Sequence, residues 1–249
     1  MAHLESFFVS PEKIQGDFLT IDGDEFHHLT HVLRKRVGDV LIAVDGRGNA
    51  YEFGVIRITR DSVRGEIQKV LRRWGEPFTR VSLIQALIKN PRFDWLLEKG
   101  TELGVSSFQP VQSKYSLIEP DKKRISRWQR ILIAALKQSG RSVLPEIHEP
   151  VPLESALKSV TSVPLKIVPE MAGRRSIRQT VNSYLHEVRL PPREVAVLIG
   201  PEGGLSDAEI QQAVSMGFQL VTLGARRLRA ETAALTATCQ VLAALDDLM

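Results

Sequence analysis

Two glycine-rich segments near the C-terminus carry the residues best suited to chemistry. One reads LIGPEGGLS at 198–206 and the other LGARRLRAET at 223–232, and each stands between an apolar run and a helical pattern. Glycine lets a backbone approach a ligand closely and leaves its N–H group accessible as a donor. The arginines of the second segment add positive charge. Two such loops at neighbouring strand ends predict a small-molecule cleft with a basic rim.

The contents of this cleft are constrained by what the first segment lacks. It is neither G-x-G-x-x-G nor the P-loop pattern that ends in Gly-Lys-Ser/Thr, and Glu202 would repel a pyrophosphate. The segment therefore suits a neutral or cationic ligand better than a nucleoside triphosphate. Either loop alone is most simply a tight turn, and it is the pair, one strand–helix unit apart, that favours a binding site.

Strands alternate with helices from residue 80 onward, and these elements must position the loops. Strands are expected at 81–88, 107–111, 165–168, 195–199 and 218–223, and helices at 90–103, 125–136, from 206 onward and at 231–245. Asn90 is expected to cap the first helix, and Ser206 with Glu209 forms a capping box for the third. Such alternation implies a mostly parallel α/β sheet with helices on both faces, whose ligands bind beyond the carboxyl ends of the strands. The loops at 169–173, 200–205 and 224–230 occupy that position.

Residues 1–74 predict a separate small β-rich domain, and residues 75–249 a second domain. Strands are expected at 39–44, 51–60 and 62–71, with the turn residues DGRGN between the first two. One or two helical turns are expected between Glu25 and Arg36. The segment 74–77, WGEP, is typical of a linker.

Composition limits the class of protein. The chain has 249 residues, 43% of them hydrophobic and 25% charged, as is ordinary for a soluble globular protein. Its one cysteine, Cys239, excludes an internal disulfide and fits a reducing compartment. Because no apolar run approaches a membrane span and no signal peptide is evident, we expect a cytoplasmic protein without a membrane partner. His27 and His31 are four residues apart, but no cysteine or nearby carboxylate completes a site, so no metal is expected.

A basic segment between Lys114 and Arg141 offers a second clue to function. It holds eight lysines and arginines against two acids, in a chain whose net charge is +4. A surface of this kind suits a polyanion such as nucleic acid. A solvated helix face explains it about as well, so charge alone leaves both interpretations open.

The glycine loops closely resemble those of the RsmE family, SPOUT-superfamily methyltransferases that methylate N3 of a uridine in bacterial small-subunit (16S) ribosomal RNA. The matching residues span nearly the whole chain: 198–206, Leu223-Gly224, Arg226, Leu228-Arg229, Glu231-Thr232, His28 with Val32-Leu33-Arg34, Glu102-Leu103-Gly104-Val105, and Gln138 with Gly140-Arg141. The sequence departs from the family's pattern at Pro169-Glu170-Met171, where His-Pro with a basic or small residue can stand.

The resemblance implies a fold, a cofactor and partners. The C-terminal domain would be a SPOUT-type, mostly parallel sheet with a deep trefoil knot, and the N-terminal domain a PUA-like β-barrel that binds RNA. The methyl donor would be S-adenosylmethionine, bound by the knot loops. The substrate would be 16S ribosomal RNA within a small ribosomal subunit or an assembly intermediate, and the protein would be a homodimer.

Site residues follow from the matched loops. The expected cofactor-binding residues are Leu198, Ile199, Gly200, Pro201, Glu202, Gly203, Gly204, Leu223, Gly224, Leu228, Arg229 and Thr232. Uridine N3 loses a proton in the reaction, and an arginine is suited to stabilise the negative charge that develops on the uracil ring. Arg229 is the first candidate and Arg226 the second. Glu231 is expected to orient an arginine or to favour the helix start rather than to act as a base.

The target base must be unpaired or extruded, because N3 lies on the Watson–Crick edge. The expected phosphate contacts and other RNA-binding residues are His28, Arg34, Lys35, Arg36, Lys122, Lys123, Arg124 and Arg141. Two alternatives stay open at this point. One is a different methylation target, such as a ribose 2′-hydroxyl, and the other is a non-catalytic RNA-binding factor in ribosome assembly.

Overall fold

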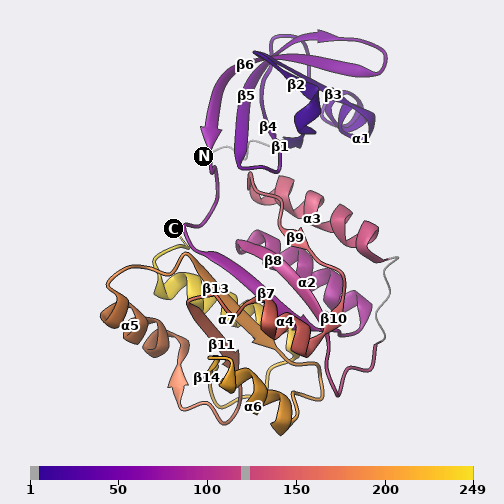
Figure 1. Ribbon diagram of the computed structural model, residues 1–249. Helices are drawn as coiled ribbons and strands as arrows, with labels where there is room; N and C mark the ends of the chain where they lie inside the picture. Colours follow the sequence, from indigo (N-terminus) through magenta and orange to yellow (C-terminus); the bar gives the residue numbers. More distant parts are fainter. Residues whose placement is uncertain (1–5, 119–123, 249) are drawn as a thin grey trace. The chain divides into compact units, whose positions relative to one another are not determined.

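The computed structural model describes residues 6–118 and 124–248, and the chain divides into two compact units (Figure 1). One unit runs up to Glu76 and also contains Ile133–Leu144, and the other consists of Pro77–Leu132 and the chain from Pro145 onward. The sequence did not indicate that Ile133–Leu144 packs with the N-terminal unit. It does so because Leu136 joins a buried apolar cluster with Ile42, Val44 and Ala50.

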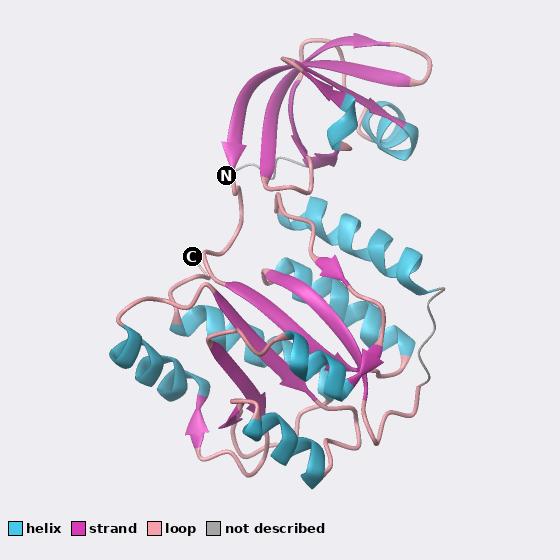
Figure 2. Cartoon of the chain, viewed as in Figure 1, coloured by secondary structure: helices cyan, strands magenta, loops and turns pink. Residues whose placement is uncertain are grey.

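The N-terminal unit is built on a six-stranded sheet (Figure 2). Its strands are β1 (Ser6–Phe8), β2 (Ile14–Gln15), β3 (Phe18–Asp22), β4 (Val40–Val44), β5 (Asn49–Ile58) and β6 (Ser62–Arg72). They lie in the order β1-β4-β5-β6-β3-β2, and every pair is antiparallel except β1 with β4. Its short helices are η1 (Pro11–Lys13), α1 (Gly23–His27) and the π-helical turn η2 (His28–Val32). The three predicted strands and the helical turns are confirmed.

The second unit contains an eight-stranded sheet in which every pair is parallel, as predicted. Its strands are β7 (Arg80–Ala86), β8 (Val105–Gln112), β9 (Glu146–Ile147), β10 (Val151–Pro152), β11 (Leu165–Pro169), β12 (Arg175–Ser176), β13 (Glu194–Ile199) and β14 (Gln219–Thr222). The order is β10-β8-β7-β13-β11-β14-β12, with β9 beside β8. Central strands β7 and β13 are buried along almost their whole length, because helices cover both faces of the sheet.

The remaining helices are α2 (Asn90–Glu102), α3 (Ile125–Ser139), α4 (Leu153–Ser159), α5 (Ile177–Val188), α6 (Asp207–Ser215) and α7 (Ala230–Ala244). Figure 1 shows α4 and α6 in front of the sheet and α2 and α7 behind it. A single apolar cluster joins α4 and α6 to the sheet through Leu157, Ala213 and Ile84. The sequence had indicated α2, α3, α6 and α7, whereas α4 and α5 were missed.

One local prediction was wrong. Asn90 does not cap α2 but is its first residue, after Lys89 in the N-cap position, and its Oδ1 accepts a hydrogen bond from Arg124 at 2.7 Å. The segment 74–77 spans the division between the two units, and Glu76 anchors it within the N-terminal unit. Glu76 is almost fully buried and accepts main-chain hydrogen bonds from Ser142 and Val143, both at 2.9 Å.

Candidate functional site

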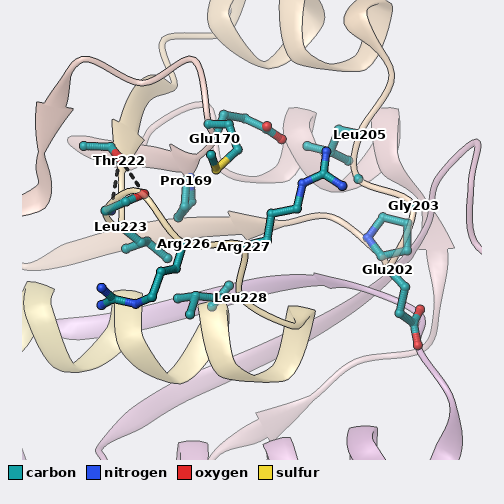
Figure 3. A pocket seen from close by; sticks show the side chains of 15 residues that line it. Pro169, Glu170, Glu202, Gly203, Leu205, Thr222, Leu223, Arg226, Arg227 and Leu228 are labelled. Atoms are coloured by element: carbon teal, nitrogen blue, oxygen red, sulfur yellow. Dashed lines mark hydrogen bonds between the residues drawn. The ribbon is translucent and has the colours of Figure 1, made fainter.

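Three loops meet at the carboxyl ends of β11, β13 and β14 and enclose a cavity of about 390 Å³ (Figure 3). Its wall consists of residues 169–171, 201–205, 222–224, 226–228 and Ala233. The position beyond the strand ends is the one expected for a ligand in an open parallel sheet. The volume lies within the range of small-molecule pockets, on the order of 300–1,000 Å³.

The first glycine loop is a tight turn that carries its backbone along the cavity. Gly204 has φ +76° and donates its N–H to the carbonyl of Pro201 at 2.9 Å. A Cβ at Gly200 would come within 3.1 Å of the backbone at Gly204, so this position leaves little room for a side chain. Helix α6 follows directly, and the capping box between Ser206 and Glu209 is present as predicted.

The second glycine loop turns back after β14. Gly224 has φ +110°, in the region that favours glycine, and its N–H donates to the Thr222 hydroxyl at 3.1 Å. Arg226 and Arg227 follow, and both side chains line the cavity. Figure 3 shows them pointing in opposite directions, with Arg227 directed toward the side where Glu170 and Leu205 lie. The sequence did not single out Arg227.

The predicted cofactor-binding residues fall into two groups. Those in the cavity wall are Pro201, Glu202, Gly203, Gly204, Leu223, Gly224 and Leu228. Those outside the wall are Leu198, Ile199, Gly200, Arg229 and Thr232. Leu198 and Ile199 are buried in β13, and the exposed Arg229 is the N-cap residue of α7, where its carbonyl accepts the Ala233 N–H at 2.8 Å.

A charged cluster links the first glycine loop to the start of α7. Arg92, in the first turn of α2, places Nη1 3.2 Å from Glu202 Oε1 and Nε 3.6 Å from Glu231 Oε1. Glu231 is only 6% exposed, and its Oε2 has no hydrogen-bond partner among the described residues. The predicted orienting carboxylate therefore contacts Arg92. The sequence did offer one indication of Arg92. It lies in the loop-to-helix segment that follows β7, and β7 is the neighbour of β13 in the sheet.

The third loop contributes Glu170, whose carboxylate lines the cavity. Burial raises the pKa of the Glu170 carboxyl, and a hydrogen bond from the Met171 main chain opposes the rise only in part. The loop is held against β14, because the Glu170 N–H donates to the Val221 carbonyl at 2.9 Å.

Comparison with known proteins assigns both parts of the chain. A family model described as an RNA methyltransferase domain matches residues 75–242, and one described as an RNA methyltransferase PUA domain matches residues 21–68. Ribosomal RNA small subunit methyltransferase E of Synechocystis sp. is 31% identical and aligns over 96% of this chain and 77% of its own length. The chain belongs to the ribosomal RNA small subunit methyltransferase E family. The resemblance seen in the glycine loops is confirmed.

Further relatives bear the same name. The ribosomal RNA small subunit methyltransferase E of Bacillus subtilis is 28% identical over 94% of both chains. A crystal structure of this methyltransferase from Neisseria gonorrhoeae, bound to S-adenosyl methionine, has a TM-score of 0.84 at 32% identity and covers 97% of this chain and 98% of its own. The methyltransferase E fold thus extends across both units.

The residues predicted to bind RNA in this methyltransferase E chain have different surroundings. Arg34 and Arg36 are exposed in the N-terminal unit, Lys35 is half-buried, and His28 is half-buried with its ring 6.1 Å from that of Phe7. Lys122 and Lys123 lie outside the described residues. Arg124 is hydrogen-bonded to Asn90.

Arg141 has a position that its sequence context did not indicate. It is 2% exposed and forms an ion pair with Glu76 at 2.7 Å within the N-terminal unit. A guanidinium buried in this way stabilises the N-terminal unit through its ion pair and is not accessible to a phosphate at the surface.

The described residues offer neither a metal site nor a membrane-spanning helix. His27 and His31 stack with ring centroids 4.6 Å apart, but no group of three His, Cys, Asp or Glu within 6–118 and 124–248 is arranged to hold a metal ion. Among the helices of these ranges, none is both long and apolar enough to cross a membrane.

Proposed function

We propose that this protein transfers a methyl group from S-adenosylmethionine to N3 of a uridine in small-subunit (16S) ribosomal RNA. One observation carries the proposal: the cavity at the carboxyl ends of β11, β13 and β14 is built by the two glycine loops of a methyltransferase E chain. The relatives' names support the reaction and the RNA, and the cofactor in the Neisseria gonorrhoeae structure supports the methyl donor.

The residues of the cavity fit S-adenosylmethionine. Leu205, Leu223 and Leu228 offer apolar surface for an adenine ring, and the open backbone around Gly204 and Gly224 leaves room for close approach. The absence of a phosphate-binding pattern agrees with a donor that carries no phosphate. When bound, S-adenosylmethionine supplies a sulfonium-activated methyl group, so the chain itself must hold the acceptor and manage charge.

In the proposed reaction, the arginines beside the cavity stabilise the negative charge that develops on the acceptor. As N3 gives up its proton, negative charge spreads over the uracil ring and its carbonyl oxygens, and a guanidinium lowers the energy of that state. Arg226 lines the cavity and Arg229 follows at the start of α7. We assign the charge-stabilising role to Arg229, with Arg226 as its alternative.

Under this proposal, the N-terminal unit binds the RNA and the second unit binds the methyl donor. The N-terminal unit, expected at residues 1–74, binds RNA through exposed residues such as Arg34 and Arg36, in keeping with its match to a PUA model. Residues 75–249 bind the methyl donor. The RNA is presented within a small ribosomal subunit or an assembly intermediate, and the protein acts as a homodimer.

Mass mapping of 16S ribosomal RNA tests the function. Small subunits from a strain lacking the gene are incubated with the purified protein and S-adenosylmethionine, and we expect a new methyl group on uracil N3. A methyl group on a ribose 2′-hydroxyl would support the alternative target. RNA binding without any methyl transfer would support a non-catalytic assembly factor.

Arginine variants test the catalytic assignment in the same assay. Arg229→Ala should lower the rate by about 100-fold, the typical loss when one transition-state donor is removed, while calorimetry shows S-adenosylmethionine still bound. Arg178→Ala is the matched control, since Arg178 is exposed on α5 outside the cavity wall. If Arg229→Ala works at the normal rate and Arg226→Ala does not, the role passes to Arg226.

A further inference from the structure

Glu170 is a charged group in the cavity wall without an ionic partner. Four charged side chains line this cavity: Glu170, Glu202, Arg226 and Arg227. Glu202 is paired with Arg92 at 3.2 Å. Glu170 has no ion pair within the described part of the chain, and the hydrogen bond to its carboxylate comes from the Met171 main chain. The cavity therefore contains one carboxylate whose charge the protein leaves unneutralised.

The position of Glu170 is fixed by a tight turn. Its N–H donates to the Val221 carbonyl at 2.9 Å, and its own carbonyl accepts the Gly173 N–H at 2.9 Å. A Cβ at Gly173 would lie 2.3 Å from the Val221 carbonyl carbon, so the turn lies directly on the backbone of β14. The side chain thus projects into the cavity from a rigid base, as a ligand-binding group requires.

Leaving this carboxylate half-buried and unpaired costs free energy, since burial disfavours the ionised form. A cation in the cavity would offset that cost. The uridine acceptor carries no positive charge, whereas S-adenosylmethionine carries a sulfonium and an α-ammonium. Arg227, which Figure 3 shows directed toward the same side, offers the opposite charge and suits the donor's α-carboxylate.

We propose that the Glu170 carboxylate pairs with positive charge on the bound methyl donor and so selects for it. This inference rests on the proposed function. The positive charge is the sulfonium or the α-ammonium, and the two sources are separated by the choice of ligand. Glu170 is therefore a specificity residue of the donor site, contributed by the loop where the sequence departs from its family's pattern.

Calorimetric titration of three ligands tests this assignment. S-adenosylmethionine carries both positive charges, S-adenosylhomocysteine keeps only the ammonium, and 5′-methylthioadenosine lacks both while keeping adenine and ribose. Glu170→Gln removes the charge at nearly constant shape. We expect it to weaken S-adenosylmethionine binding about tenfold or more, the usual effect of losing one charge-assisted hydrogen bond, and to leave 5′-methylthioadenosine binding unchanged.

The outcomes separate the alternatives. If S-adenosylhomocysteine weakens as much as S-adenosylmethionine, the partner is the ammonium, and if it does not weaken, the partner is the sulfonium. An equal loss for 5′-methylthioadenosine would mean ribose recognition and would overturn the proposal, as would unchanged binding of all three ligands. Unchanged binding together with lost turnover would instead make Glu170 a base.

Two controls keep this test apart from the proposed function. Glu187→Gln, an exposed position on α5, should leave binding of all three ligands unchanged. Normal binding of 5′-methylthioadenosine shows that the Glu170→Gln cavity is intact. If the unaltered protein does not bind S-adenosylmethionine, the proposed function fails. If it binds and Glu170→Gln binds equally well, only this inference fails.

Discussion

At the scale of single residues, Arg92 connects two carboxylates that the sequence placed in separate roles. Glu202 belongs to the first glycine loop and Glu231 begins α7, and the guanidinium of Arg92 lies between them. None of the arginines near Glu231 in the sequence, Arg226, Arg227 or Arg229, forms an ion pair with it among the described residues. We therefore propose that Arg92 is a positioning residue, which holds one wall of the proposed donor site through these two contacts.

Replacing Arg92 should disturb that wall in a graded manner. Arg92→Ala leaves the buried Glu231 carboxylate without its partner, and we expect a loss of roughly 1–3 kcal/mol in stability, together with weaker S-adenosylmethionine binding. Arg92→Lys should recover part of the affinity, because one ammonium reaches a single carboxylate. Thermal unfolding and calorimetry measure the two effects.

The double variant Arg92→Ala/Glu231→Gln distinguishes positioning from simple loss of charge. It should recover stability, because no unpaired charge stays buried. It should not recover donor affinity, because the link to Glu202 is still missing. Recovery of both would contradict the positioning role.

At the scale of elements, the shape of the site depends on how helices begin. Ser206 accepts the Glu209 N–H, and the Glu209 carboxylate accepts the Ser206 N–H at 2.8 Å. This capping box ends the first glycine loop and starts α6, so the helix start and the cavity wall share one set of hydrogen bonds.

Ser206→Ala should cost about 1 kcal/mol of stability, the usual loss for an N-cap, and should weaken S-adenosylmethionine binding because the loop loses its anchor. Ser215→Ala, at the other end of α6, is the control and should leave binding unchanged. Urea unfolding and calorimetry provide the measurements. Unchanged binding in Ser206→Ala would show that the loop holds its shape without the cap.

Sequence patterns identified the elements that carry strong local signals. Strands β7, β11 and β13 are short, mostly buried runs rich in apolar residues, and α6 opens with a capping box, so each was predictable. The two-residue strands β2, β9, β10 and β12 are too short for any periodicity and acquire their structure from the sheets. Helix α5 was missed although it opens with a capping box between Ser176 and Gln179, the same local signal that marks α6.

The site was predictable to the extent that backbone conformation fixed it. The glycines at 204 and 224 indicated turns with positive φ, and both turns line the cavity. Arg92 and Arg227 were missed because an ion pair across distant segments and the direction of a side chain depend on tertiary packing. Arg141 was misjudged for the same reason: its charge was visible in the sequence, but its burial against Glu76 was not.

At the scale of the whole molecule, the arginines divide into structural and exposed groups. Arg141→Ala would leave Glu76 buried and unpaired, which typically costs about 3–5 kcal/mol, so we expect a large fall in the unfolding temperature of the N-terminal unit. Arg36→Ala should leave that temperature nearly unchanged and should weaken RNA binding, because Arg36 is exposed. Calorimetric unfolding and an RNA-binding titration at fixed salt separate the two. Unaltered stability in Arg141→Ala would contradict the structural role.

The contribution of Ile133–Leu144 to the N-terminal unit has a consequence for how this protein can be divided. A fragment ending at residue 74 would lack Leu136, and the apolar side chains of Ile42, Val44 and Ala50 would meet water instead. A fragment beginning at residue 75 would retain Lys137 without Glu25, its ion-pair partner. Cutting the chain at that boundary therefore does not yield two intact units. We expect residues 1–74 expressed alone to be less stable than the same residues within the full chain.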